Sequence, residues 1–130
     1  MGRCGDELLS RIEHFADRCV AVAEELDRLG RSQRIVDQLI GSGTSVGANM
    51  FEADEGMSRK DFCRSVAISI KELNETRFWL RLIARRDWIP GARLDQLAAE
   101  VDELKRILGA ILSRSRANNP RKTKSGPLAI

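Results

Sequence analysis

The chain has 130 residues, 42% hydrophobic and 32% charged, which suits one domain with its own core and excludes a wholly disordered chain. No apolar run approaches the roughly 20 residues of a membrane span, and the N-terminus lacks the apolar core of a signal peptide. Three cysteines without a C-x-x-C pair, and one histidine, argue against a Cys/His zinc site and indicate reduced thiols in a cytoplasmic protein.

The formal net charge of +3 is distributed unevenly along the chain. Residues 114–130 contain five basic residues and no acidic ones, which leaves 17 basic against 19 acidic residues before them. We therefore expect a nearly neutral helical domain over residues 1–115 and a basic, disordered arm over residues 116–130. The five basic residues are Arg114, Arg116, Arg121, Lys122 and Lys124.

The first predicted helix follows an apolar stripe from Leu8 to Leu29 at alternating spacings of four and three residues, and Gly30 closes it. The second runs from about residue 32 to 55, with Ser32 as its N-cap. Its stripe is small and polar in the middle, where three glycines also fall. Either the helix breaks near residue 43, or it stays continuous and packs closely against another backbone; we favour a continuous or kinked helix.

The third predicted helix, about residues 58–85, is capped by Ser58 and carries a long stripe of core positions. A second apolar edge on this helix indicates contacts on two sides, one with the core and one with a neighbouring subunit. After a turn at Pro90-Gly91, the fourth helix covers about residues 93–114. The third-helix stripe is Phe62, Val66, Ser69, Leu73, Thr76, Leu80 and Ile83, and the second edge is Ile68, Trp79 and Leu82.

No segment shows the strict alternation of a half-buried strand. Four amphipathic helices with short connections place helices that are sequential in the chain next to one another. The sequence therefore predicts an all-α, antiparallel up-down-up-down four-helix bundle.

A cluster of polar residues interrupts the apolar pattern of the second and third helices. Inward-facing carboxylates are a feature of di-iron bundles, but those need a Glu-x-x-His pair on two helices, and His14 is the single histidine. Since the sequence has no nucleophile arrangement, phosphate-binding loop or cofactor fingerprint, we expect no enzyme, cofactor or metal. We interpret the polar residues as a structural cluster that fixes helix register: Ser45, Asn49, Glu52, Lys71, Glu72, Glu75 and Thr76.

Three runs within these helices, residues 45–53, 58–62 and 71–80, resemble the four-helix bundle proteins encoded in intervening sequences of bacterial 23S ribosomal RNA genes. The resemblance covers about residues 10–115, with Phe78 where the family commonly has Tyr. It implies a bundle assembled as a ring, often a homopentamer, without known enzymatic activity. A related branch, the accessory variability proteins of diversity-generating retroelements, binds nucleic acid and a reverse transcriptase; the glycine-rich second helix places this chain nearer the intervening-sequence group.

Basic residues on the third helix and at the C-terminus are candidates for nucleic-acid binding. Their spacing suits contact with phosphates, although an ordinary solvated face would look similar. Aromatic residues total 5% and include no Tyr, which argues against a platform for base stacking. The candidates are Lys60, Arg64, Arg77, Arg81, Arg85, Arg114, Arg116, Arg121, Lys122 and Lys124.

We expect a cytoplasmic bacterial protein without a membrane partner. Its sequence and the family resemblance leave two functions open. The first is a non-enzymatic, ring-forming bundle, a homopentamer by resemblance, that binds RNA or DNA through backbone phosphates. The alternative is a protein–protein scaffold or accessory subunit, for example of a reverse transcriptase, that does not itself bind nucleic acid. The apolar edge serves assembly in both.

Overall fold

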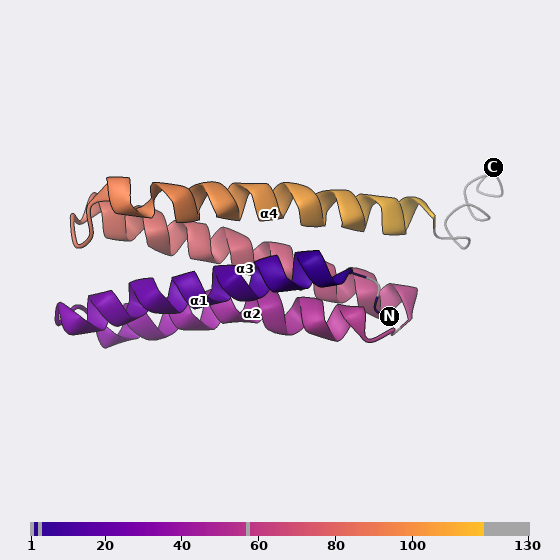
Figure 1. Ribbon diagram of the computed structural model, residues 1–130, viewed down its shortest axis with the longest axis horizontal. Coiled ribbons are helices and arrows are strands. Elements are labelled where there is room, and N and C mark those ends of the chain that lie inside the picture. Colours follow the sequence, from indigo (N-terminus) through magenta and orange to yellow (C-terminus); the bar gives the residue numbers. More distant parts are fainter. Residues whose placement is uncertain (1, 3, 57, 119–130) are drawn as a thin grey trace, which may run out of the picture.

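The computed structural model describes residue 2, residues 4–56 and residues 58–118. They form four helices, α1 (Asp6–Arg28), α2 (Gln33–Asp54), α3 (Arg59–Arg85) and α4 (Gly91–Ala117). In Figure 1, α1 and α3 run in one direction along the long axis, and α2 and α4 run in the other. The predicted antiparallel four-helix bundle is confirmed.

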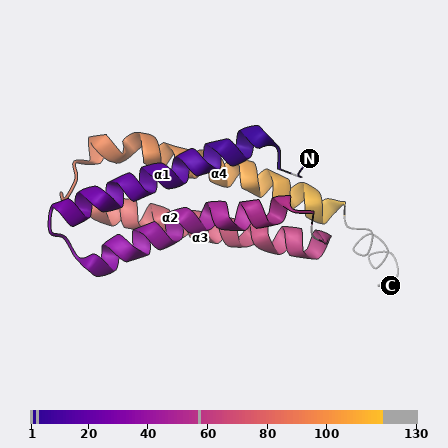
Figure 2. The same ribbon diagram turned by 60° about the horizontal axis from the view of Figure 1, so that its bottom comes forward.

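Two of the turns have the expected residues at their helix ends. Gly30 has a φ of 70°, and Arg31 N–H donates to the Leu26 carbonyl over 2.9 Å, which closes α1 in the expected glycine turn. The Ser58 hydroxyl accepts from Asp61 N–H at the start of α3. Ser32 occupies the N-cap position of α2, but its side chain makes no capping bond. Figure 2 shows the start of α1 and the end of α4 at the same end of the bundle as the α2–α3 turn.

The end of α4 differs from the expected domain boundary. The helix continues to Ala117, so Arg116 is helical rather than part of an arm that begins at residue 116. Arg114 lies on the same final turns and is also exposed. Arg121, Lys122 and Lys124 lie outside the described residues.

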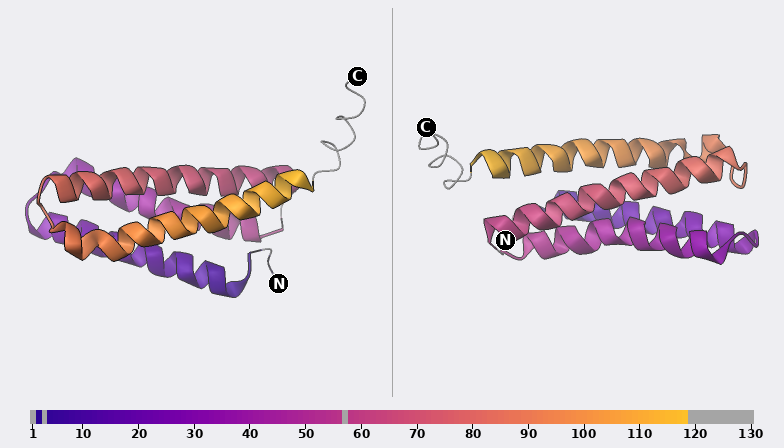
Figure 3. Two further views of the ribbon diagram at one scale, coloured as in Figure 1. Left: turned by 90° about the horizontal axis from the view of Figure 1, so that it is seen from above. Right: turned by 180° about the vertical axis from the view of Figure 1, so that it is seen from behind.

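Each helix packs mainly against its neighbours in the chain, whereas α1 and α4 meet much more sparsely. The right-hand view of Figure 3 shows α3 lying between α4 and α2. Because α2 has α1 on one side and α3 on the other, its buried surface is wider than a single stripe. Val36 and Met50 are therefore buried, while Ile35 and Asn49 of the predicted stripe are only half-buried. Every position of the predicted α3 stripe is buried.

The small residues in the middle of α2 permit close packing on both sides of a continuous helix. A Cβ atom at Gly43 would lie 2.5 Å from Cys19 Cβ on α1. On the face turned to α3, the Thr76 hydroxyl donates to Ser42 Oγ over 2.9 Å, and the Ser69 hydroxyl donates to the Val46 carbonyl over 3.0 Å. The helix thus has no break near residue 43, and its glycine and serine form the packing seam.

The seam predicts opposite effects for two neighbouring glycines. Gly43→Ala should lower the free energy of unfolding by about 1–3 kcal/mol, because its methyl group overlaps Cys19. Gly41→Ala should raise it by up to about 1 kcal/mol, because nothing lies within 4 Å of that methyl group and alanine is the better helix former. Urea denaturation at one protein concentration measures both; equal stabilisation of the two variants would contradict the close approach.

Burial also predicts the reactivity of the cysteines. It raises the pKa of the Cys19 thiol to about 12, so the thiol stays protonated and unreactive at pH 8 in the folded protein. Iodoacetamide should therefore label Cys19 only after the protein is unfolded in urea. It should label the half-exposed Cys63 in the folded protein as well. Peptide mass spectrometry locates the label; equally fast labelling of both thiols in native buffer would contradict the packing around Cys19.

Candidate nucleic-acid interface

The surface of α3 that points away from the core is a basic ridge. Arg64, Lys71, Phe78 and Arg85 recur every seven residues, which is close to two helical turns, and all four are exposed. They lie opposite the α3 stripe that the bundle buries. Two further exposed cations extend the row. We call this surface the α3 ridge: Lys60, Arg64, Lys71, Phe78, Arg81 and Arg85.

The arginines predicted on this helix differ in their availability. Arg77 is half-buried and forms an ion pair with Asp102 on α4, so it joins the two helices. Within the described part of the chain, Arg64, Arg81 and Arg85 have no carboxylate at ion-pair distance. These three cations therefore face solvent without a compensating charge, and Arg77 only flanks them.

The predicted polar cluster is divided between three environments. Asn49 donates to the Ser45 carbonyl over 2.9 Å on its own helix, and Glu52 is exposed. Lys71 belongs to the α3 ridge, a placement that its seven-residue spacing from Arg64 could have indicated. Of the predicted cluster, Thr76 alone is buried, and there it packs against α2.

The register-fixing contacts are therefore those of smaller side chains than expected. Ser42 and Ser69, together with Thr76, are almost fully buried between α2 and α3. Among the described residues, no buried side-chain nitrogen or oxygen lacks a hydrogen-bond partner. Hydroxyl groups satisfy each other and nearby carbonyls here, whereas a carboxylate in the same seam would need to be desolvated.

A half-buried strip of apolar and acidic residues runs along α3 beside the ridge. Trp79 packs against the core, and its Nε1 donates to Glu75 over 3.4 Å. Partial burial, and secondarily the neighbouring Glu75, raise the pKa of Glu72. Ile68 and Leu82, the other residues of the predicted second edge, are also half-buried. The predicted edge thus exists as a strip that the bundle covers only in part.

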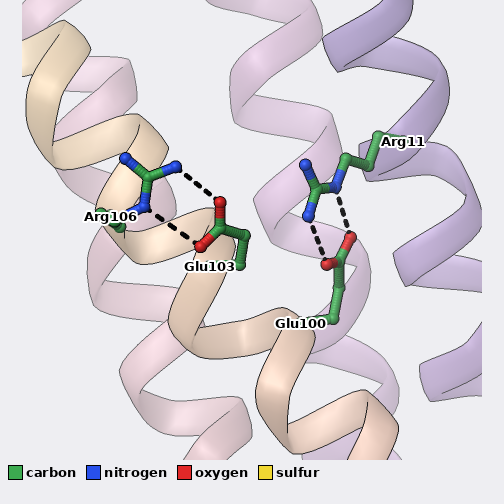
Figure 4. A network of polar contacts seen from close by, with 4 residues as sticks. All are labelled: Arg11, Glu100, Glu103 and Arg106. Carbon is green, nitrogen blue, oxygen red and sulfur yellow. Dashed lines mark hydrogen bonds and ion pairs between the residues drawn. The ribbon is translucent and has the colours of Figure 1, made fainter.

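Two arginines of α1 and α4 are paired with glutamates, in contrast to the unpaired arginines of the ridge. Arg11 of α1 donates two hydrogen bonds of 2.7 Å to Glu100 of α4, and this interaction raises the pKa of Arg11. Figure 4 shows this pair beside a second one, between Arg106 and Glu103 within α4. Because their donors are already engaged, these arginines are poorly placed to bind a phosphate.

The basic residues at the end of α4 lie next to the start of α3. Arg59 Nη1 donates to the Ser115 carbonyl over 3.2 Å, which brings the two helix ends together. Arg114 and Arg116 are exposed on these last turns of α4, and Arg114 lines a surface hollow together with Arg59 of α3. Cations of α4 thus lie beside the first turn of α3.

The described residues include no group of three or more His, Cys, Asp or Glu side chains placed to hold a metal ion. None of their helices combines the length and the hydropathy that crossing a membrane requires.

Residues 7–110 match a family model described as 23S rRNA-intervening sequence protein. The structure is similar to a crystal structure at 1.70 Å resolution of a protein of unknown function from the S23 ribosomal protein family of Bacteroides thetaiotaomicron. The two chains are 32% identical and have a TM-score of 0.77, and the match covers 80% of this chain and 96% of the other. Among curated proteins, none matches the sequence.

The environment of Glu72 predicts a pH-dependent stability. The pKa of Glu72 is raised above the ordinary value of 4.5, so its ionised form destabilises the folded protein. The fold is therefore most stable at low pH, where Glu72 is protonated, and loses stability as the pH rises through the folded-state pKa of Glu72. Glu72→Gln should therefore raise Tm at pH 7 and leave it nearly unchanged at pH 3.5. The matched change at the exposed Glu52, Glu52→Gln, should show no such difference; thermal melts across this pH range that shift equally would contradict the assignment.

Proposed function

The chain belongs to the 23S rRNA-intervening sequence protein family, and from this premise we propose that it is a non-enzymatic helical bundle that binds nucleic acid through phosphate contacts along the α3 ridge. The observation that carries the proposal is the row of exposed cations without carboxylate partners on the outer face of α3. Elsewhere on the bundle, Arg11, Arg28 and Arg106 are engaged by glutamates.

The length and chemistry of the ridge suit a polyanion. From Lys60 to Arg85 the helix spans roughly 37 Å, enough to follow several successive phosphates of one strand. Arginine donates two parallel hydrogen bonds to a phosphate, and release of counterions favours the complex at low salt. These contacts do not read sequence, so the ridge would position a strand rather than select one.

We also propose that the protein acts as a homo-oligomeric ring. Ile68, Trp79 and Leu82 form a half-buried apolar strip on α3 that a second copy could cover. A ring would present several ridges to one nucleic acid, and linked weak sites raise overall avidity. For the pentamer implied by the family resemblance, light scattering should give five times the chain mass of 14.6 kDa; a stable monomer would contradict the ring.

The same apolar strip favours the second candidate function, a protein–protein scaffold or accessory subunit. In that case the strip alone is functional, and the partner is another protein, such as a reverse transcriptase. The two functions differ in one measurable property, because the scaffold would form a defined oligomer without affinity for nucleic acid.

The decisive prediction concerns two cations of the ridge. Arg81→Glu combined with Arg85→Glu should weaken binding of a mixed-sequence RNA at least tenfold at about 0.1 M salt and reduce the slope of log K against log salt by about 1–2, since two phosphate contacts are lost. Filter binding at rising salt measures both quantities. We choose Arg85 rather than Arg77 because replacing Arg77 would also break its ion pair with Asp102.

The matched control carries the same charge change on other faces. Arg28→Glu combined with Arg106→Glu removes two exposed arginines that are already paired with glutamates. It should leave affinity within about threefold of the wild type, as expected for a non-specific field effect of net charge. Absence of binding by the wild type at low salt, or equal loss in both double variants, would contradict the proposed function.

A further inference from the structure

We propose that Phe78 stacks on an unpaired base, so that the ligand of the α3 ridge is single-stranded nucleic acid; this inference rests on the proposed function. Phe78 is the most exposed large hydrophobic residue of the described chain, at 57% of its full accessible area. It sits in the middle of the ridge, with Lys71 and Arg85 seven residues away on either side. An aromatic ring in this position is not needed for the core.

The surroundings of the ring match the chemistry of a nucleotide. A surface hollow of about 460 Å³ is lined entirely by residues of α3. Its lining supplies two unpaired guanidinium groups, those of Arg81 and Arg85, the guanidinium of Arg77 that pairs with Asp102, one amide and an aromatic ring, and no carboxylate. The lining residues are Asn74, Arg77, Phe78, Arg81, Leu82 and Arg85.

The aromatic ring of Phe78 contacts Trp79 and is otherwise largely exposed to solvent. Phe78 and Trp79 form an edge-to-face pair with centroids 5.0 Å apart and an interplanar angle of 71°. Such a pair covers at most one face of the Phe78 ring. Trp79 is itself held by core packing and by its bond to Glu75. A base that stacks on the open face of Phe78 therefore meets a ring whose position is already defined.

The arrangement favours a single strand over a duplex. In a duplex the bases are stacked on one another, so the ridge could use only its cations. In a single strand, a base can leave its neighbours and stack on Phe78, while Arg81 and Arg85 bind phosphates one and two turns further along. The amide of Asn74, one turn before the ring, can donate to and accept from a base edge.

Charge distinguishes this occupant from a second copy of the chain. Arg81 and Arg85, the two unpaired arginines beside Phe78, would repel the same surface of a second copy in a two-fold contact, whereas a polyanion neutralises them. Phe51 on α2 offers a natural comparison, because it is also exposed, at 42%, but is adjacent to the exposed Glu52 and one turn from Glu55. A polyanion would be repelled there. The low aromatic content is therefore compatible with stacking, since one well-placed ring is enough.

The test uses the full chain and four fluorescein-labelled ligands of twelve nucleotides, read by anisotropy: oligo(U), oligo(dT), an abasic strand with the same phosphates, and a duplex. The wild type should bind both single strands more tightly than the abasic strand and the duplex. Phe78→Ala should weaken binding of the single strands on the order of 5- to 100-fold, and should leave the abasic strand, the duplex and the salt slope within about twofold.

Two further variants complete the design. Phe78→Trp should bind the single strands at least as tightly as the wild type, because indole stacks well on bases. Phe51→Ala should bind every ligand as the wild type does. Thermal melts should show all three variants folded, since both phenylalanines are exposed.

The outcomes separate this inference from the function on which it depends. If the wild type binds none of the ligands, both fail. If it binds but Phe78→Ala behaves as Phe51→Ala does, or the abasic strand binds as tightly as oligo(dT), the stacking role is overturned and the phosphate-binding function stands. If Phe78→Ala changes the light-scattering mass while single-strand affinity is retained, the Phe78 side chain belongs to an interface between copies of the chain. That result also overturns the inference.

Discussion

The close approach of α2 to both of its neighbours is the constraint on which the rest of the bundle depends. On one side Gly43 leaves no room for a side chain against Cys19. On the other, Ser42 and Val46 accept hydrogen bonds from hydroxyl groups of α3. These bonds specify the rotation of α3 about its own axis, because a hydroxyl group reaches its acceptor from only one face of a helix. The outward position of the α3 ridge follows from that rotation.

The electrostatic pattern of α3 is unfavourable for an isolated helix. Like charges four residues apart destabilise a helix by a few tenths of a kcal/mol for each pair, and Arg77, Arg81 and Arg85 form two such pairs. Arg77 is relieved by Asp102, whereas the other two are not compensated within the described chain. On α1 and α4, by contrast, Arg11 and Arg106 are paired with glutamates. A net charge of +3 therefore conceals two different surfaces, one internally neutralised and one able to gain from a polyanion.

Much of the fold could be predicted from the sequence because it depends on local periodicity. The α3 stripe is buried at every predicted position, and the glycine and serine residues at the helix ends act largely as expected. Less of the candidate site could be predicted from the sequence. The pairing of Arg77 depends on where α4 lies, which residues distant in the chain decide. The sequence places Lys71 in a polar cluster because its neighbours are polar, and it identifies Phe78 only as the residue that stands where the family commonly has Tyr. The rotation of α3 shows that both residues face solvent.

The sparse packing between α1 and α4 has a consequence for the order in which the bundle comes apart. The backbone of α4 lies close to α3 along much of its length and approaches α1 at few points, where Arg11 donates two hydrogen bonds to Glu100. A helix with fewer partners opens at a lower free energy than the global unfolding transition. Detachment of α4 would leave a three-helix layer whose close seam around α2 is intact. It would also separate Asp102 from Arg77 and add a third uncompensated guanidinium to the row that Arg81 and Arg85 begin.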